Sequence, residues 1–387
     1  MRYARGVDAN TPVAADAAVA APAAPTGLRA RLDAFRAKHK QLEGALFFVG
    51  GFCFDLLLLE RIDSRPMLIH QGSYLVLLSI LLAVDHHYSQ AHVEKKGLWG
   101  KALHYRHELI HFLFGTLLNA FLVFYFKASS GVFAFGFLCL LGALLLANES
   151  PRFRELGPLM RVALYSFALT SYFSYLYPVI AGYLSPWLFV AAVGTASAVT
   201  IVLWFVYQRF TPDESWNFKN ALAPALVIQG LLLALYFMHV VPPVPLSVKW
   251  MGVYHGVERE GRESRLLHEA PRWKFWAHGD TDFKARPGDR VWAFVRVFAP
   301  RNFDDGIKIR WFRDDPKKGW VGTDAIPLRI VGGGEEGWRG EAYKDHYVPG
   351  DWRVEIETND GRTIGELDFT ITADDSTAPR EFRKDLR

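Results

Sequence analysis

Residues 221–245, ALAPALVIQGLLLALYFMHVVPPVP, decide the fold because they hold an apolar segment of bilayer length and the signal that ends it. A bilayer core takes roughly 20 predominantly apolar residues per helix. The window 220–241 meets that length. Pro242-Pro243-Val244-Pro245 then ends it, since proline lacks an amide donor and restricts the residue before it. This stretch therefore predicts a membrane helix followed by a different kind of structure.

Six further apolar windows precede it along the chain, so the sequence predicts about seven transmembrane helices. They are residues 44–60, 66–84, 108–126, 131–148, 156–181 and 185–206. The fold class that we predict is an α-helical membrane bundle with a C-terminal all-β, sandwich-like domain. We divide the chain into a disordered, basic N-terminal tail (1–43), the bundle (44–241), a linker (242–270), the β domain (271–373) and a charged tail (374–387).

The positive charge is concentrated in the apolar half, and it sets the predicted orientation. Residues 1–247 hold 19 Lys+Arg against 14 Asp+Glu, whereas residues 248–387 hold 25 against 26. Lys and Arg stay on the cytoplasmic side of a membrane helix. Seven of them lie in the N-terminal tail, while the predicted outer loops hold only Arg61, Arg65 and Lys127. An odd number of crossings then puts the N-terminus in the cytoplasm and the β domain outside it. The net charge of +4 is thus no argument for nucleic acid.

Beyond residue 271 the sequence changes to a period of two, which is typical of strands. In Val291–Phe298 small and large apolar residues alternate, which predicts a strand covered on both faces. The surest hairpin is Asp351–Thr372, around the turn Asn359-Asp360-Gly361. Further strands are predicted at 307–313, 325–331 and 338–344. Short strands at this spacing indicate a small antiparallel sandwich.

Four short motifs of the β region carry a family resemblance. They are Val295-Arg-Val-Phe-Ala-Pro300, Ile307-Lys-Ile-Arg-Trp-Phe312, Gly350-Asp-Trp-Arg-Val-Glu-Ile356 and Asp360-Gly-Arg-Thr-Ile-Gly365. They resemble the bacterial domain-of-unknown-function family numbered 2914. Residues 111–127 and Ala147-Asn-Glu149 resemble the membrane region that accompanies that domain, so the resemblance covers roughly 44–372. It implies a bacterial envelope protein and implies no activity. Arg310 stands where the family pattern leads us to expect a histidine.

The sharpest chemical motif is His107-Glu108-Leu109-Ile110-His111 at the predicted cytoplasmic start of the third membrane helix. On a helix, His107 and His111 share a face and suit Zn²⁺, with Glu108 activating water. A third ligand is available at the same membrane edge from Asp85, His86 or His87, or from Glu149. His104 lies one turn earlier on the helix face of His107 and His111. The competing interpretation places these histidines at the headgroup level without metal, and we favour it, with no cofactor.

Two ionisable residues inside the apolar windows, Asp55 and Arg161, raise the further alternative of a transporter or channel component. Asn119 and Gln229 are candidates for hydrogen bonds between helices. The cysteines, Cys53 and Cys139, both lie in apolar stretches and give no disulfide framework.

Tryptophans are concentrated in the β region, where some of them are candidates for a glycan-stacking platform. They are Trp273, Trp276, Trp292, Trp311, Trp320, Trp338 and Trp352. For Trp292, Trp311 and Trp352 we favour a place in the core. The preferred function is therefore a non-enzymatic envelope protein: a bilayer-anchored, exported β domain that binds a protein or glycan partner, with no nucleic acid. This interpretation predicts an exposed aromatic patch on the β domain.

Overall fold

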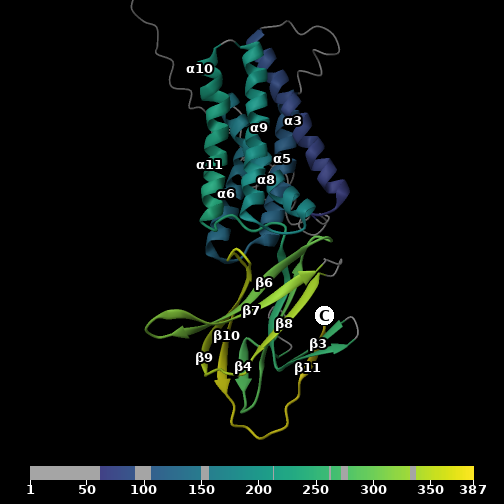
Figure 1. Cartoon of the computed structure of the whole chain (residues 1–387), viewed down its shortest axis with the longest axis vertical. Helices are drawn as coiled ribbons and strands as arrows, with labels where there is room; N and C mark the ends of the chain where they lie inside the picture. Colours follow the sequence, from purple (N-terminus) through teal and green to yellow (C-terminus); the bar gives the residue numbers. More distant parts are fainter. Residues whose placement is uncertain are drawn as a thin grey trace, which may run out of the picture. The chain divides into compact units, whose positions relative to one another are not determined.

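The computed structural model describes residues 62–91, 106–149, 157–211, 213–260, 263–271, 278–331 and 337–387. All of them belong to the second of two compact units, Phe52–Arg387. Helices make up the described chain as far as residue 237, and strands make up the rest from residue 247 (Figure 1).

The helical part contains five long helices and a final interrupted one. They are α3 (Arg65–Ala91), α5 (Arg106–Ala128), α6 (Gly131–Glu149), α8 (Gly157–Ala181), α9 (Pro186–Phe210) and the run α10 (Glu214–Asn217), η1 (Phe218–Leu222) and α11 (Ala223–Phe237). Helix α9 begins at an N-cap in which Ser185 accepts a hydrogen bond from the Trp187 amide, with Pro186 in the first turn. Each predicted window from residue 66 onward overlaps a helix, although 220–241 runs past the end of α11 at Phe237. The first window, 44–60, lies outside the described residues.

Helix α8 is the central helix of this bundle. It contacts α3, α5, α9 and α11, and most of its residues from Val162 to Tyr175 are buried. The buried side chains include Ser166, Thr170 and Ser171. Ser166 donates to the Ala225 carbonyl of α11, Thr170 donates to the Ser166 carbonyl within α8, and Ser171 accepts from Tyr125 of α5.

The prediction of about seven transmembrane helices is not supported. Within the described residues, four helices are long and apolar enough to cross a membrane, at 65–89, 106–128, 186–210 and 214–237. Helix α8 is not among them, since its buried Ser, Thr and Tyr residues reduce its apolar character. In α6 the described apolar stretch is the short segment Phe135–Leu144.

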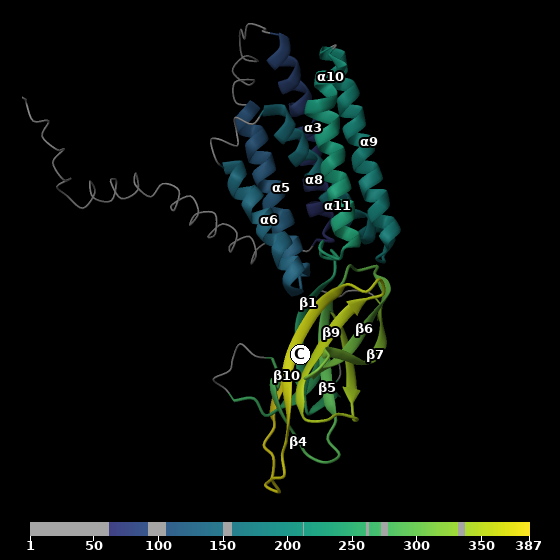
Figure 2. The same ribbon diagram turned by 90° about the vertical axis from the view of Figure 1, so that its left-hand side faces the viewer.

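The β part contains two main sheets and a smaller third one (Figures 1 and 2). The strands are β1 (Ser247–Tyr254), β2 (Gly256–Glu260), β3 (Glu263–His268), β4 (Asp282–Ala285), β5 (Val291–Phe298), β6 (Asp304–Asp315), β7 (Gly319–Val331), β8 (Trp338–Lys344), β9 (Gly350–Thr358), β10 (Thr363–Ala373) and β11 (Arg383–Leu386). Their orders are β1-β5-β8, β4-β10-β9-β6-β7 and β11-β3-β2. All pairs are antiparallel except β4 with β10.

The main core lies between the first two sheets and follows from the period-two alternation of their strands. Ile307 and Ile309 of β6 and Val354 and Ile356 of β9 are all completely buried. In β5 only Trp292 and Arg296 are not buried, and both lie on the second face, so the predicted covering is complete on one face and partial on the other. Phe294, on the second face of β5, is covered by Tyr254 and Leu266 in a small separate core.

Local turn chemistry predicted one hairpin well and missed another. The β9–β10 hairpin around Asn359-Asp360-Gly361 is confirmed. The predicted linker 242–270 instead contains β1, β2 and β3, and the predicted charged tail contains β11. Strands β2 and β3 escaped recognition because exposed charged residues such as Glu258 and Arg265 pair across this hairpin and hide the apolar alternation.

Candidate functional site

The H-E-x-x-H motif begins α5, as predicted, and His107 lies beside Asp85 of α3. The distance from His107 Nδ1 to Asp85 Oδ1 is 3.5 Å. The structure therefore brings one motif histidine to one of the residues that the sequence offered as a third zinc ligand.

Both oxygens of the Asp85 carboxylate are, however, already hydrogen-bonded to arginines. Arg106 Nε donates to Oδ1 at 2.6 Å, and Arg161 Nη1 donates to Oδ2. The Asp85 side chain is only 7% exposed. A buried carboxylate between two guanidinium groups is strongly held in place, because losing either partner leaves charge without compensation. Asp85 is thus the centre of an ion triad that joins α3, α5 and α8.

Among the residues that the structure describes, no group of three or more His, Cys, Asp or Glu side chains lies close enough to hold a metal ion. Glu149 is the last residue of α6, and its side chain and all of His104 lie outside the described part. The zinc site of His107, His111 and Glu149 stays a prediction. Asp55 also lies outside the described residues, so of the two predicted intramembrane charges only Arg161 has a described partner.

The neighbouring histidines of α3 pack against α9. His86 is buried and stacks on Tyr207 at 4.0 Å between ring centroids, and its Nε2 lies 3.0 Å from Thr211 Oγ1. His87 lies 4.5 Å from the Phe210 ring. Both side chains therefore take part in helix packing.

Hydroxyl and amide side chains connect the helices along α8 and α9. Tyr175 donates to Gln71 of α3, and Ser166 donates to the Ala225 carbonyl of α11 at 3.0 Å. Gln229 accepts from Ser197 of α9 at 2.7 Å, which confirms the predicted interhelical role of Gln229. These hydrogen bonds connect neighbouring helices.

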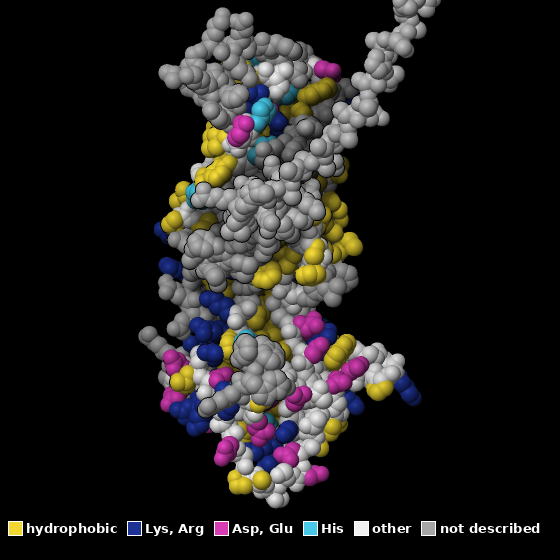
Figure 3. All heavy atoms as spheres, turned by 180° about the vertical axis from the view of Figure 1, so that it is seen from behind, with side chains coloured by type: hydrophobic (Ala, Val, Ile, Leu, Met, Phe, Trp, Pro, Cys, Tyr) yellow, Lys and Arg dark blue, Asp and Glu magenta, His cyan; other side chains and the backbone are white. Residues whose placement is uncertain are grey.

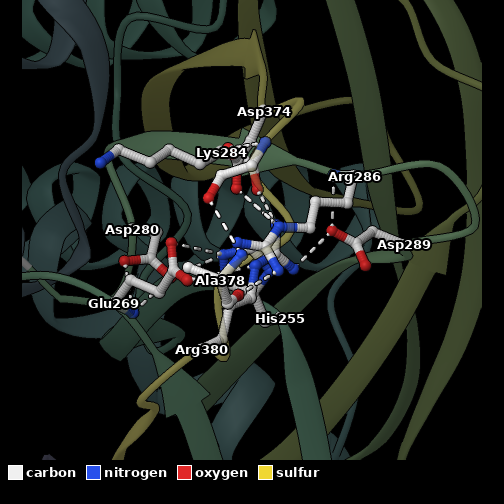
Figure 4. A network of polar contacts seen from close by, with 10 residues as sticks. His255, Glu269, Asp280, Lys284, Arg286, Asp289, Asp374, Ala378 and Arg380 are labelled. Carbon is white, nitrogen blue, oxygen red and sulfur yellow. Dashed lines mark hydrogen bonds and ion pairs between the residues drawn. The ribbon is translucent and has the colours of Figure 1, made fainter.

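A second polar cluster lies inside the β domain and surrounds His255 (Figure 4). The His255 side chain is 3% exposed, and its Nε2 lies 3.6 Å from Asp280 Oδ2 and 3.8 Å from Glu269 Oε2. Asp280 accepts the Glu269 amide hydrogen at 2.9 Å. No hydrogen-bond partner of His255 Nε2 lies among the described residues.

Burial moves the pKa values of this pair in opposite directions. It raises the pKa of Asp280 to about 7, with the negative charge of Glu269 adding to the effect and backbone N–H donors opposing it. It lowers the pKa of His255 to about 4, and the positive charge of Arg380 adds to this. The folded domain therefore holds Asp280 protonated and His255 neutral in mildly acidic solution.

The C-terminal segment closes this cluster through Arg380. Arg380 Nη1 donates to Asp289 at 2.7 Å, and Nη2 donates to the Lys284 carbonyl at 2.6 Å. Arg286 donates from the other side to Asp374 at 2.7 Å and to the Ala378 carbonyl at 2.8 Å. Charged partners thus anchor the segment that leads from β10 to β11.

Arg362 links the β9–β10 turn to α11 and lines a small cavity there. It is 4% exposed, and its guanidinium lies 3.3 Å above the centre of the Tyr236 ring. Its Nε lies 2.8 Å from Asp360 Oδ2. Burial lowers the pKa of Arg362. The cavity is also lined by Ser174, Phe189 and Pro243.

The tryptophans divide between core and surface. Trp311 and Trp352 are 1% and 2% exposed, which confirms their predicted place in the core. Trp292 is only partly buried and packs against Tyr343 at 4.9 Å. Trp320 is 39% exposed, and Trp273 and Trp276 lie outside the described residues.

Trp320 belongs to the solvent-facing side of the five-stranded sheet, where two aromatic rings each lie against an arginine. Arg353 lies 4.5 Å from the Trp320 ring centre, and Arg310 lies 4.8 Å from that of Phe312. We call these four residues the aromatic–arginine face. Arg310, which departs from the family pattern, thus has a defined position here, and it donates to Glu357 at 2.8 Å.

Sequence reasoning singled out Trp320 but missed the rest of this face and the whole His255 cluster. The signal for the face is the alternation of Arg310 and Arg353 with buried Ile309, Trp311 and Trp352 along their strands. The His255 cluster joins residues from five separate segments, so no local pattern marks it.

Comparison with known proteins gives a family match within the β domain and no activity. Residues 304–371 match the model of a family described as a protein of unknown function, DUF2914, which confirms the resemblance over that stretch. No curated protein is significantly similar to the chain. An immunoglobulin-like protein from Pseudomonas aeruginosa is similar at 12% identity over 33% of this chain and 98% of its own, with a TM-score of 0.21. A Pseudomonas fluorescens alkylpurine DNA glycosylase bound to DNA is similar at 12% identity over 81% and 99%, with a TM-score of 0.22.

Proposed function

We propose that the helical part anchors the chain in a bacterial membrane by several passes and that the β domain is a binding module on the outer side. The observation that carries the anchoring is the outer surface of the helices. Ile69, Phe112, Val202 and Val227 are 71%, 61%, 62% and 66% exposed. Hydrophobic side chains gather over this part and charged ones over the β part (Figure 3).

The interior of the bundle supports the same proposal. One group of charges is turned inward, since Asp85 is buried against Arg106 and Arg161. A soluble protein seldom exposes a contiguous apolar surface of this kind, and intramembrane charges pair inside a bundle. Apolar side chains outside and paired charges inside fit a lipid surrounding.

The outer location of the β domain is supported by the distribution of Lys and Arg. The test is a pair of reporters fused after Arg387, alkaline phosphatase and green fluorescent protein. We expect an active phosphatase and a dark fluorescent protein, because the phosphatase folds only outside the cytoplasm. Fusions after Ser150, in a predicted cytoplasmic loop, are the control and should behave in the opposite way. A fluorescent fusion after Arg387 would refute the orientation.

The zinc enzyme remains a second candidate because His107 lies 3.5 Å from Asp85. Its test is the zinc content of the purified full chain beside that of a variant with both His107→Ala and His111→Ala. Equal zinc content in the two proteins would remove this candidate. Zinc in the wild type alone would establish a metal site at the start of α5.

A further inference from the structure

The aromatic–arginine face is only partly covered. Strands β6, β7 and β9 carry it, and the core lies on the opposite side of β6 and β9, whereas β7 is exposed on both sides from Gly319 to Ala325. Gly322 of β7 leaves room for the side chains of this face. A Cβ there would lie 3.3 Å from Arg310 Nη2 and 3.5 Å from a carbon of the Phe312 ring. Both groups therefore lie close over the β7 backbone.

Both arginines of the face are paired with carboxylates of the same sheet. Asp368 accepts two hydrogen bonds from Arg353, at 2.6 and 2.9 Å, and Glu357 accepts one from Arg310. Glu366 lies 3.1 Å from Arg353. A cationic peptide would have to compete with these arginines, while an anionic polymer would meet more carboxylates than guanidinium groups.

We propose that the aromatic–arginine face binds an uncharged saccharide, which stacks a sugar ring on Trp320. A sugar presents an apolar C–H face to an aromatic ring and hydroxyl groups at its edge. Those hydroxyl groups both donate and accept, so they suit a border of carboxylates and guanidinium groups already paired with one another. This inference rests on the proposed function, whose partner it names.

A raised pKa at the border agrees with this geometry. Burial raises the pKa of Glu355, and the negative charges of Glu366 and Glu357 add to the effect. Glu355 also accepts a hydrogen bond from Thr363 at 3.3 Å.

The test is a calorimetric titration of the full chain in phosphatidylcholine nanodiscs with chitotetraose and with cellotetraose. Nanodiscs are needed because maltoside detergents carry sugars that compete for the face. We expect saturable binding of at least one tetrasaccharide. Trp320→Ala should weaken it about tenfold, which corresponds to the roughly 1.4 kcal/mol of a well-placed aromatic contact. Trp320→Phe should keep most of the affinity.

The matched control is Tyr343→Ala, because Tyr343 is exposed to a similar degree, 42%, but lies on β8 of the other sheet. Its affinity should equal that of the wild type. The proposal would be overturned if neither sugar bound saturably, or if Trp320→Ala and Tyr343→Ala bound with equal affinity. Binding of a lysine decapeptide instead of the sugars would overturn it as well. The reporter fusions after Arg387 test the location of the β domain independently. If they place the domain outside the cytoplasm but neither sugar binds, only the saccharide proposal is rejected.

Discussion

The buried pair His255 and Asp280 predicts that two single substitutions change the pH dependence of stability in opposite directions. The variants are His255→Gln and Asp280→Asn, each measured in the full chain as the free energy of unfolding against pH. Tryptophan fluorescence follows the unfolding, since eight of the 12 tryptophans lie in residues 248–387.

The magnitudes follow from the two pKa values. Raising the pKa of Asp280 from 3.8 to about 7 makes its ionised form about 4 kcal/mol less favourable in the folded state, at roughly 1.4 kcal/mol per pKa unit. Its contribution to stability is complete below 3.8 and is lost as the pH rises to about 7. Lowering the pKa of His255 from 6.5 to about 4 corresponds to about 3 kcal/mol. That contribution is complete above 6.5 and is lost as the pH falls to about 4.

In the wild type these two effects cancel between pH 4 and 6.5. The unfolded chain there carries an ionised Asp280 and a protonated His255, whereas the folded chain carries a protonated Asp280 and a neutral His255. Both states bind one proton, so this pair adds no slope to the stability curve. Folding in effect transfers a proton from the imidazole to the carboxylate.

Each variant removes one of the two opposing slopes. As the pH rises from 4.5 to 6, the stability of His255→Gln should fall relative to the wild type by about 1.4 kcal/mol per pH unit. The stability of Asp280→Asn should rise at the same rate over the same range. His346→Gln is the control, because the His346 side chain is 96% exposed, and its curve should run parallel to that of the wild type. Parallel curves for all four proteins, or slopes of the same sign in the two variants, would refute the proton transfer.

Two further predictions concern the triad and the core. Arg161→Ala leaves the buried Asp85 with one fewer cation, so we expect a loss of about 3–5 kcal/mol, seen as a lower melting temperature in detergent, whereas an unchanged melting temperature would contradict the role of the triad. Ile309→Ala opens a cavity at a completely buried position and should lower the free energy of unfolding by about 2–5 kcal/mol, measured with denaturant. The control Val331→Ala, at a side chain 64% exposed, should change it little. Equal losses in the two variants would argue against the two-sheet core.

The features that the sequence predicted well are those that depend on neighbouring residues. The β9–β10 hairpin needs only two alternating runs around Asn359-Asp360-Gly361. The helices from residue 66 onward need only apolar windows of sufficient length. Strands β2 and β3 were missed because their exposed charges mask the alternation that identifies a strand.

The parts of the sites that were not predicted depend on contacts between distant residues. The sequence makes Asp85 a candidate metal ligand because it lies at the same predicted membrane edge as His107, but its partners are Arg106 and Arg161 of other helices. Likewise, His255 meets Asp280 only because the β1–β2 region folds back along the segment before β4. The local sequence around a buried charged residue does not show which distant residue is its partner.

In the membrane-inserted bundle that we propose, the triad of Asp85, Arg106 and Arg161 also constrains assembly. Asp85 and Arg106 are made well before Arg161, so an unfinished chain that stops before α8 leaves the Asp85 carboxylate without one of its two cations. A buried charge is costly to leave uncompensated. The early helices would therefore reach their final packing only after α8 has joined them.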